Sequence, residues 1–222
     1  MFSAFKHKEI DSTAAVDMIE GIVYKAVKPL GFRKFGRTLH RFVDWDISQV
    51  IHFQNGCPQK DVYDVLWVNL GIRVPECAER TFAVAAEKKR YYHEYDCNIR
   101  TRLGELVDGK DTSYDLRDKP EKIGTDILEK LNRYVLPLYE KIHSRDAVLE
   151  YREEICDFDH MDYRRMADLQ EAMIYGARGE QEAAERLFNR YYRSAAENLM
   201  NPGHLRYLEE LAGKLGISLE NR

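Results

Sequence analysis

The chain has 222 residues, of which 44% are hydrophobic and 32% are charged, a composition that excludes a mainly disordered protein. The 38 Asp and Glu residues outnumber the 34 Lys and Arg residues, so the net charge of −4 excludes recruitment of nucleic acid by an overall basic field. A chain of this length buries enough surface to fold without disulfides or a structural metal ion.

The first predicted element is an amphipathic helix over about residues 13–28. Its apolar residues recur at steps of three and four, Asp11 can cap its start, and Gly31 follows its end. Two runs rich in β-forming residues come next, 38–43 and 47–54, with a short acidic turn between them. This pattern predicts a β-hairpin.

A third strand is predicted over 65–74, where apolar residues alternate with other residue types. Asn69 and Arg73 lie on the face opposite its apolar side chains. A weaker fourth strand is predicted over 95–103, and the stretch 76–92 between the two is interpreted as a helix. Since the strands have one apolar face, we expect an antiparallel sheet with helices covering that face.

From Pro120 onward, every segment has the apolar spacing of a helix. An apolar stripe runs over 123–142, and Pro137 inside it should kink or end that helix. Further helices are predicted over 144–154, 162–177, 180–198 and 203–215.

These elements together predict an α+β fold, in which an N-terminal helix packs on an antiparallel sheet of about four or five strands. A helical C-terminal region follows. We expect one α+β domain over 1–143 and a helical extension over 144–222. Because one helical hairpin cannot bury the apolar stripes of the last helices, we expect the extension to pack on the first domain rather than fold independently.

A series of short motifs also runs along the predicted α+β domain. They occur in this order: Pro29–Phe32, Arg37–Thr38, Ile51–Gln54, Val68–Ile72, Cys97–Leu106 and Tyr114–Leu116. In this order they resemble the bacterial family called domain of unknown function 4304, over about Met18 to Ile142. The family often carries a tryptophan pair where this chain has Ser113 and Tyr114. The resemblance implies an α+β domain and no activity, and the helices after about Ser144 lie outside it.

The stretch between Gly21 and Val43 contains no acidic residue. Its basic residues are Lys25, Lys28, Arg33, Lys34, Arg37 and Arg41. One interpretation is an edge that binds an anion or an acidic partner, to which Arg37 or Arg41 adds positive field. The alternative is structural, with the lysines complementing a helix C-terminus and the strand charges protecting a sheet edge.

Four polar side chains within the predicted strands are the main candidates for ligand binding: Gln54, Asn69, Arg100 and Arg102. Alternation puts both arginines on one strand face, where two guanidinium groups can clamp a carboxylate or a phosphate. The amides offer a donor and an acceptor, which can fix the orientation of a ligand. Two alternatives stay open: a solvated sheet face with cross-strand polar pairs, and an ion network between the arginines and nearby acids.

The sequence contains none of the common motifs for catalysis or phosphate binding, neither GxSxG, GxxxxGKS/T nor HExxH. We therefore predict no catalytic residue, no metal ligand and no cofactor. His40 and His52 flank the predicted hairpin turn and could form a metal-binding or acid–base pair, whereas the alternative is a surface pair. The acidic run 157–162 lacks the glycine and the terminal glutamate of a calcium loop and is interpreted as helix caps.

The four cysteines are Cys57, Cys77, Cys97 and Cys156, and none lies close enough to another for a zinc-ligand pair. The N-terminal residues contain no signal-peptide core, and no apolar run in the chain is long enough to span a bilayer. We therefore expect four reduced thiols in a cytoplasmic protein that does not contact a membrane.

The leading hypothesis for function is a non-enzymatic binding protein of the toxin-immunity or defence-associated kind. Its partner would be a protein or an anionic ligand rather than nucleic acid. The alternative is an enzyme or small-ligand binder that acts on a phosphoester-like anion at the polar sheet face. A deep pocket formed by the four candidate residues would favour this alternative, whereas a flat sheet and an exposed apolar patch on the C-terminal helices would favour a protein partner.

Overall fold

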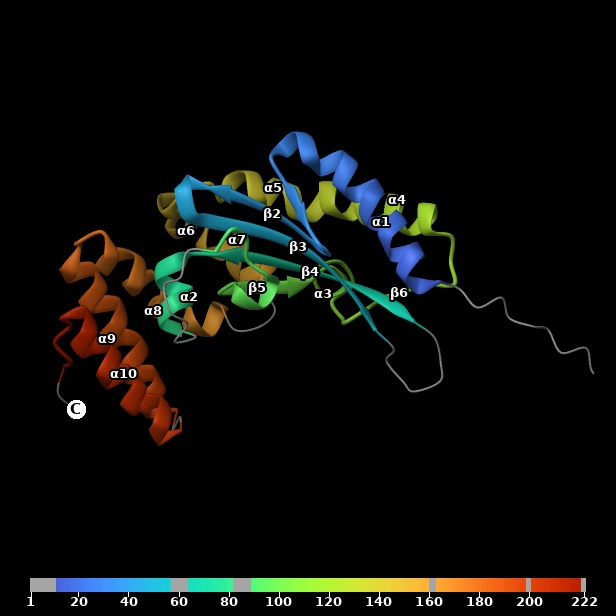
Figure 1. The fold of residues 1–222 in the computed structure, drawn as a ribbon. Helices are drawn as coiled ribbons and strands as arrows, with labels where there is room; N and C mark the ends of the chain where they lie inside the picture. Colours follow the sequence, from blue (N-terminus) through green and yellow to red (C-terminus); the bar gives the residue numbers. More distant parts are fainter. Residues whose placement is uncertain (1–10, 57–63, 82–88, 160–162, 199–200, 221–222) are drawn as a thin grey trace, which may run out of the picture.

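An antiparallel sheet with helices on one face forms the centre of the computed structural model, which describes residues 11–56, 64–81, 89–159, 163–198 and 201–220 (Figure 1). The strands are β1 (Arg33–Phe35), β2 (Thr38–Val43), β3 (Ile47–Gly56), β4 (Val65–Arg73), β5 (Ile99–Arg102) and β6 (Tyr114–Asp115). The helices are α1 (Ser12–Val27), α2 (Pro75–Thr81), α3 (Leu103–Asp108), α4 (Pro120–Lys130), α5 (Leu136–Lys141), α6 (Arg145–Glu150), α7 (Arg152–Phe158), α8 (Tyr163–Ala177), α9 (Gln181–Glu197) and α10 (Pro202–Leu215).

Strands β1 to β5 lie side by side in chain order, each antiparallel to its neighbour, and β6 pairs with the start of β4. The predicted α+β class is therefore confirmed: an N-terminal helix, an antiparallel sheet and a helical C-terminal region. The sheet has six strands because β1 and β6 add to the four predicted ones. With three and two residues, these two strands are too short to show an alternating pattern in the sequence.

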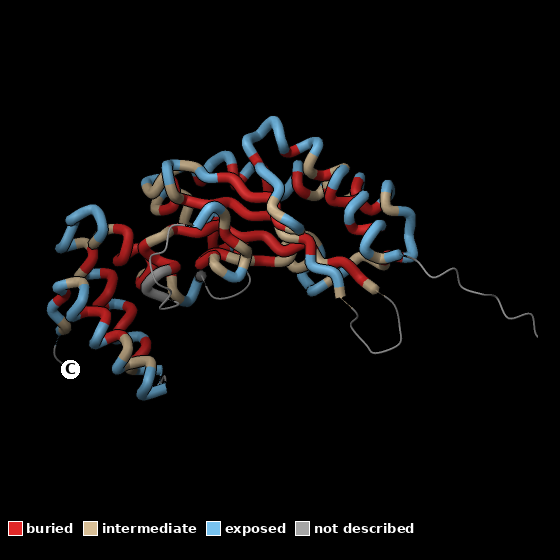
Figure 2. The backbone as a smooth tube through the Cα atoms, in the orientation of Figure 1, coloured by how far each residue is buried: buried red, intermediate tan, exposed pale blue. Residues whose placement is uncertain are grey.

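Helices α1, α4 and α5 cover one face of the sheet, and their apolar side chains share a core with that face (Figures 1 and 2). Leu39, Ile51 and Leu70 are cross-strand neighbours on this face and are completely buried. The alternation of side chains puts polar residues on the opposite face. We call that face the polar face, formed by Thr38, His40, His52, Gln54, Trp67, Asn69, Gly71, Arg73, Arg100 and Arg102.

The helix predicted over 76–92 is described only in part. Its start lies in α2, its centre at 82–88 lies outside the described part of the chain, and residues 89–92 are not helical; a 3-10 turn, Glu94–Asp96, follows them. The fourth predicted strand consequently begins at Ile99 rather than at about residue 95.

The helical segment with Pro137 is interrupted as predicted. A π-helical turn, Leu131–Val135, separates α4 from α5, and Pro137 lies in the first turn of α5. Proline has no N–H and tolerates that position, which explains why a new helix begins there. The helix predicted over 144–154 is also divided, at Tyr151, into α6 and α7.

Helices α8, α9 and α10 form a layer beyond one end of the sheet (Figure 1). Seven residues of these helices are buried in the core: Leu169, Ala172, Met173, Leu187, Phe188, Tyr191 and Leu208. Helix α8 contacts α2, and α7 contacts β5, so the layer adjoins the sheet domain directly. Within the described residues, no helix combines the length and apolar character needed to cross a membrane.

Candidate functional site

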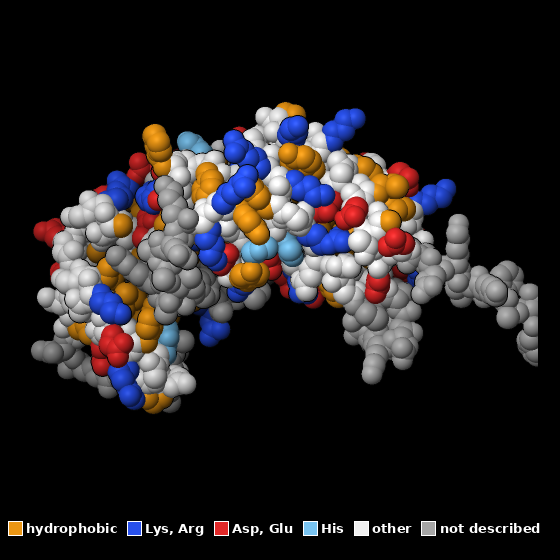
Figure 3. Space-filling model, viewed as in Figure 1, with side chains coloured by type: hydrophobic (Ala, Val, Ile, Leu, Met, Phe, Trp, Pro, Cys, Tyr) orange, Lys and Arg blue, Asp and Glu red, His pale blue; other side chains and the backbone are white. Residues whose placement is uncertain are grey.

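A row of polar residues crosses the polar face from β2 to β5. Thr38 pairs with His52, His52 pairs with Asn69, and Asn69 pairs with Arg102, so four neighbouring strands each contribute one polar side chain at the same level. Figure 3 looks onto this face, where histidine and basic side chains lie near one another. The row exists because β-strand alternation directs every second residue to the same side and the antiparallel register aligns them.

Hydrogen bonds connect one end of this row. The Nε of Arg102 donates to Oδ1 of Asn69 at 3.1 Å, and Nδ2 of Asn69 donates to Oε1 of Gln54 at 2.8 Å. The Arg102 guanidinium also lies 5.5 Å from the ring centre of Trp67 and forms an ion pair with Asp111. These contacts hold Arg102 in one orientation.

An open pocket of about 330 Å³ lies over this end of the row. Its lining residues are Gln54, Asn69, Glu94, Arg100, Thr101, Arg102 and Glu105. The structure therefore brings together all four of the main candidates proposed from the sequence. It also adds two carboxylates, Glu94 and Glu105, so the lining carries both positive and negative groups.

The remaining two candidates, Arg37 and Arg41, are not among the pocket's lining residues. Arg41 is in phase with Leu39 along β2, so it faces the helices and is 9% exposed. Its guanidinium donates to the Gln49 side chain at 2.7 Å and to a carboxylate oxygen of Glu140 at 2.8 Å. This network is buried at Arg41 and Gln49 and reaches the exposed Glu140, so it connects β2 with the end of α5 and stabilises the fold.

Arg37 lies between β1 and β2, where its guanidinium is 3.6 Å from the carboxylate of Asp17 on α1. Arg37 also lies near His52. Burial is the main cause that lowers the pKa of His52, with smaller effects of the nearby His93 and Arg37, while Glu94 acts in the opposite direction. Arg37 is therefore beside the row and outside the pocket itself.

The segment 91–96 folds back across the polar face and places His93 beside His52. Tyr91 stacks on Phe35 with 4.6 Å between ring centres, and His93 stacks on Tyr95 at 4.9 Å. These ring contacts fix the segment over β1 to β3. Sequence reasoning missed His93 and Glu94, because the contacts that return this segment to the sheet join residues far apart in the chain, and no periodicity reveals them.

His52, His93 and Glu94 form a compact cluster next to the pocket. One ligand atom of each lies within 4.8 Å of one ligand atom of each of the others. The hydroxyl of Thr38 hydrogen-bonds Nδ1 of His52 at 2.9 Å and Nδ1 of His93 at 3.2 Å. The histidine pair on the polar face is therefore His52 with His93, whereas the sequence suggested His40 with His52; the His40 ring packs against Phe42 instead.

A larger pocket, of about 880 Å³, lies between the C-terminal helices. Its arginines are engaged with acids: Arg152 and Arg190 both pair with Asp168, and Arg164 pairs with Asp157. Arg102 of the smaller pocket is likewise paired, with Asp111, so ion pairing does not distinguish the two pockets. The smaller pocket differs in that its lining lies on the polar face of the sheet, where Asn69 and Gln54 are hydrogen-bonded to each other.

Comparison with known proteins places the sheet in a family. The family model named domain of unknown function (DUF4304) matches residues 23–141, more than half of the chain. The chain belongs to the DUF4304 family. Neither the curated proteins nor the solved structures provided a match.

The DUF4304 match contains all six strands, and with them the polar face, the pocket and the histidine cluster. Helices α6 to α10 lie after its end. The candidate site is therefore a feature of the DUF4304 domain, and the C-terminal helices are an addition to it.

Proposed function

We propose that this DUF4304 protein is a binding protein that holds a small anionic molecule in the pocket on its polar face. The observation that supports this proposal is the convergence of Gln54, Asn69, Arg100 and Arg102 on one pocket. A guanidinium group pairs with a carboxylate or a phosphate through two parallel hydrogen bonds, and an amide beside it can orient the rest of the ligand.

The two carboxylates of the pocket restrict which functional groups the ligand can carry. Since Glu94 and Glu105 line the same space as the two arginines, a purely anionic ligand would meet repulsion on one side. The proposed ligand therefore carries hydroxyl or ammonium donors in addition to its carboxylate or phosphate.

The first test measures binding of simple probes to the full chain. A small amino acid, which carries an ammonium group beside its carboxylate, should raise the melting temperature as its concentration increases, and by more than inorganic phosphate does at the same concentration. Arg102→Lys should weaken the better probe tenfold or more, because a charged hydrogen bond contributes about 1.5–3 kcal/mol and lysine cannot reproduce the planar fork. The matched control is Arg186→Lys, which changes an exposed arginine on α9 and should leave the affinity unchanged.

A different outcome for the arginine variants would contradict the proposed binding site. If Arg102→Lys and Arg100→Ala lose stability while the probe still binds with native affinity, then both arginines serve the fold and the pocket is not the binding site. Binding that also persists in Gln54→Ala would contradict the proposal further, because Gln54 is exposed and its removal should not disturb the core.

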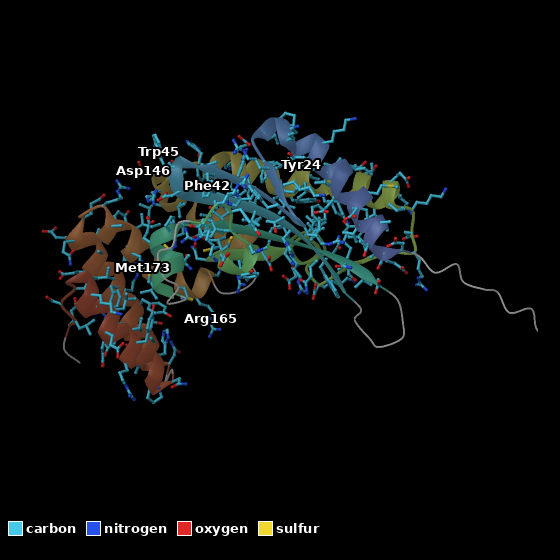
Figure 4. The ribbon with its side chains drawn as sticks, in the orientation of Figure 1. Tyr24, Phe42, Trp45, Asp146, Arg165 and Met173 are labelled. Carbon is cyan, nitrogen blue, oxygen red and sulfur yellow. The ribbon has the colours of Figure 1, made fainter. Side chains whose placement is uncertain are left out.

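A protein partner is the second candidate, supported by one observation. Trp45, in the turn between β2 and β3, is 92% exposed, and nearby Phe42 is 38% exposed (Figure 4). Exposed tryptophans often anchor protein interfaces. If this residue mediates self-association, the apparent mass of the full chain in size-exclusion chromatography should rise with concentration, and Trp45→Ser should abolish that rise. A toxin-immunity or defence role remains a hypothesis.

We further propose that the protein works in a reducing compartment such as the cytoplasm. Three of the cysteines, Cys77, Cys97 and Cys156, are buried thiols and form no disulfide within the described residues; Cys57 lies outside them. Labelling of the unfolded, unreduced protein with a thiol reagent should count all four thiols. A count of two or none would contradict the proposal.

A further inference from the structure

We propose that His52, His93 and Glu94 bind a divalent transition-metal ion of the Zn²⁺ type on the polar face. Two imidazoles and one carboxylate are a ligand set that zinc accepts in proteins. The three side chains come from β3 and from the 3-10 turn that crosses it, so the fold itself brings them together. This inference goes beyond the ligand pocket and does not depend on it.

The spacing of the three ligand atoms suits one ion. If all three pairs were separated by the full 4.8 Å, the point equidistant from them would lie about 2.8 Å from each atom. Zinc bonds to nitrogen and oxygen ligands are about 2.0–2.2 Å long, so each side chain needs to move inward by only about 0.7 Å. Small rotations of the side chains provide a shift of this size.

Thr38 orients the two histidine rings for metal binding. Its hydroxyl oxygen lies within hydrogen-bond distance of Nδ1 of both rings, at 2.9 Å and 3.2 Å, so it sets how the two rings face each other. A hydroxyl oxygen has two lone pairs and can accept hydrogen bonds from two donors at once. A hydrogen bond that holds the ring is the usual way in which proteins orient a metal-binding histidine.

Glu94 provides an independent indication. Its Oε2 atom is buried and has no hydrogen-bond partner among the described residues. A buried carboxylate oxygen without a partner is costly, and a cation beside it removes that cost. Tyr95 and Tyr91 pack on the neighbouring His93, so this part of the cluster is already held in place.

The proposed ion would have three protein ligands, which leaves a fourth tetrahedral position for water or for another molecule. Glu94 belongs to the cluster and also lines the pocket, so the two sites are adjacent. A molecule in the pocket could therefore reach the fourth coordination position of the ion.

The test uses the full chain after removal of metal with a chelator. Zn²⁺ is titrated in competition with a coloured chelator, and Co²⁺ is added separately as a spectroscopic probe of tetrahedral coordination. One strong site per chain is expected. His93→Gln and Glu94→Gln should each weaken Zn²⁺ binding at least 100-fold, and Thr38→Val should weaken it about 10–100-fold because it removes only the supporting hydrogen bonds.

The matched control is His143→Gln. His143 is exposed after the end of α5 and its ring contacts the Lys141 carbonyl, so this change should leave the strong site intact. The melting temperature of each metal-free variant shows whether it folds. The proposal is overturned if wild type has no strong site, or if folded His93→Gln and Glu94→Gln bind Zn²⁺ as wild type does. Phosphate binding that is retained in His93→Gln would show that the pocket works separately from the metal site.

Discussion

His40 is buried among aromatic rings, and this environment disfavours its charged form. Its side chain is 2% exposed and its ring packs edge-on against Phe42 and, at a longer distance, near Phe35 and Tyr92. Nε2 has no hydrogen-bond partner among the described residues. This burial lowers the pKa of His40 to about 4, compared with 6.5 for an ordinary histidine.

The shifted pKa predicts a specific loss of stability in acid. The unfolded chain binds a proton at His40 below about pH 6.5, whereas the folded chain resists it down to about pH 4, so the free energy of unfolding falls across this window. Between about pH 7 and pH 5 this residue should account for up to about 2 kcal/mol. In urea unfolding, the free energy of unfolding of His40→Phe should fall less between pH 7 and pH 5 than that of wild type. The lowered pKa of His52 affects both proteins alike, so an equal fall in the two would contradict the lowered pKa of His40.

Tyr139 joins the helices to the backbone of the sheet. Its hydroxyl accepts a hydrogen bond from the N–H of Gly71 at 3.1 Å and lies 2.8 Å from the carbonyl oxygen of Val50. Tyr139→Phe should therefore lower the free energy of unfolding by about 1–3 kcal/mol, because buried backbone groups lose their partner. Tyr134→Phe is the matched control at a 37% exposed position and should have little effect. Denaturant titration distinguishes the two, and equal effects would refute the role of the hydroxyl.

At the scale of residues, strand alternation was sufficient to put Gln54, Asn69, Arg100 and Arg102 on the polar face, because it depends only on local geometry. The same rule places Arg41 with the apolar side chains of β2, where the structure has it. His93 could not be placed in this way, since its contact with His52 joins residues far apart in the chain.

The turn between β2 and β3 shows how one element can be held in a strained form. Asp44 and Trp45 have φ values of 43° and 67°, in the left-handed region that bulky residues rarely adopt. Arg145, at the start of α6, lies 3.0 Å from Asp46 and 2.7 Å from the buried carboxylate of Glu76. This arginine therefore ties the turn to α6 and to α2.

Removal of that arginine should destabilise the protein. Arg145→Met leaves the Glu76 carboxylate buried without its partner, so we expect a loss of about 2–4 kcal/mol in the free energy of unfolding. Combining it with Glu76→Met should recover most of the loss. Arg178→Met provides the control, because its pairs with Asp146 and Glu180 are largely exposed, and such pairs contribute about 0–1 kcal/mol. If Arg145→Met and Arg178→Met lower the free energy of unfolding equally, the buried Arg145–Glu76 pair stabilises the protein no more than an exposed pair does.

At the scale of elements, long periodic helices were predictable and short elements were not. Helix α9 has a clear apolar stripe and lies within one residue of its predicted bounds at each end. The last part of the helix predicted over 76–92 is not helical: residues 89–92 lie outside any helix, and the turn at 94–96 contacts the sheet. Tyr91 and His93 pack there against rings of β1 and β3, and such long-range contacts override local propensity.

Side-chain and backbone contacts connect the DUF4304 domain with the helices that follow it. Phe158 on α7 lies 6.1 Å from Tyr139 between ring centres, and the carboxylate of Asp159 accepts a hydrogen bond from the backbone N–H of Arg100 at 2.8 Å. Further along, Asn98 donates to the side chain of Gln170 on α8 at 2.6 Å. The helical extension therefore supports the same strand, β5, that carries the two pocket arginines.

These contacts predict that the extension is not an independent module. A chain ending at residue 143 loses Phe158, Asp159 and all of α8. Neither Arg100 on β5 nor Asn98 just before it then keeps its hydrogen bond to the extension, and the core around Tyr139 is exposed. A chain ending at residue 159 loses only the contacts of α8 to α10. We expect the urea midpoint to fall in the order full chain, 1–159, 1–143. An unchanged midpoint for 1–143 would show instead that the DUF4304 domain folds alone and that its pocket needs no support from the C-terminal helices.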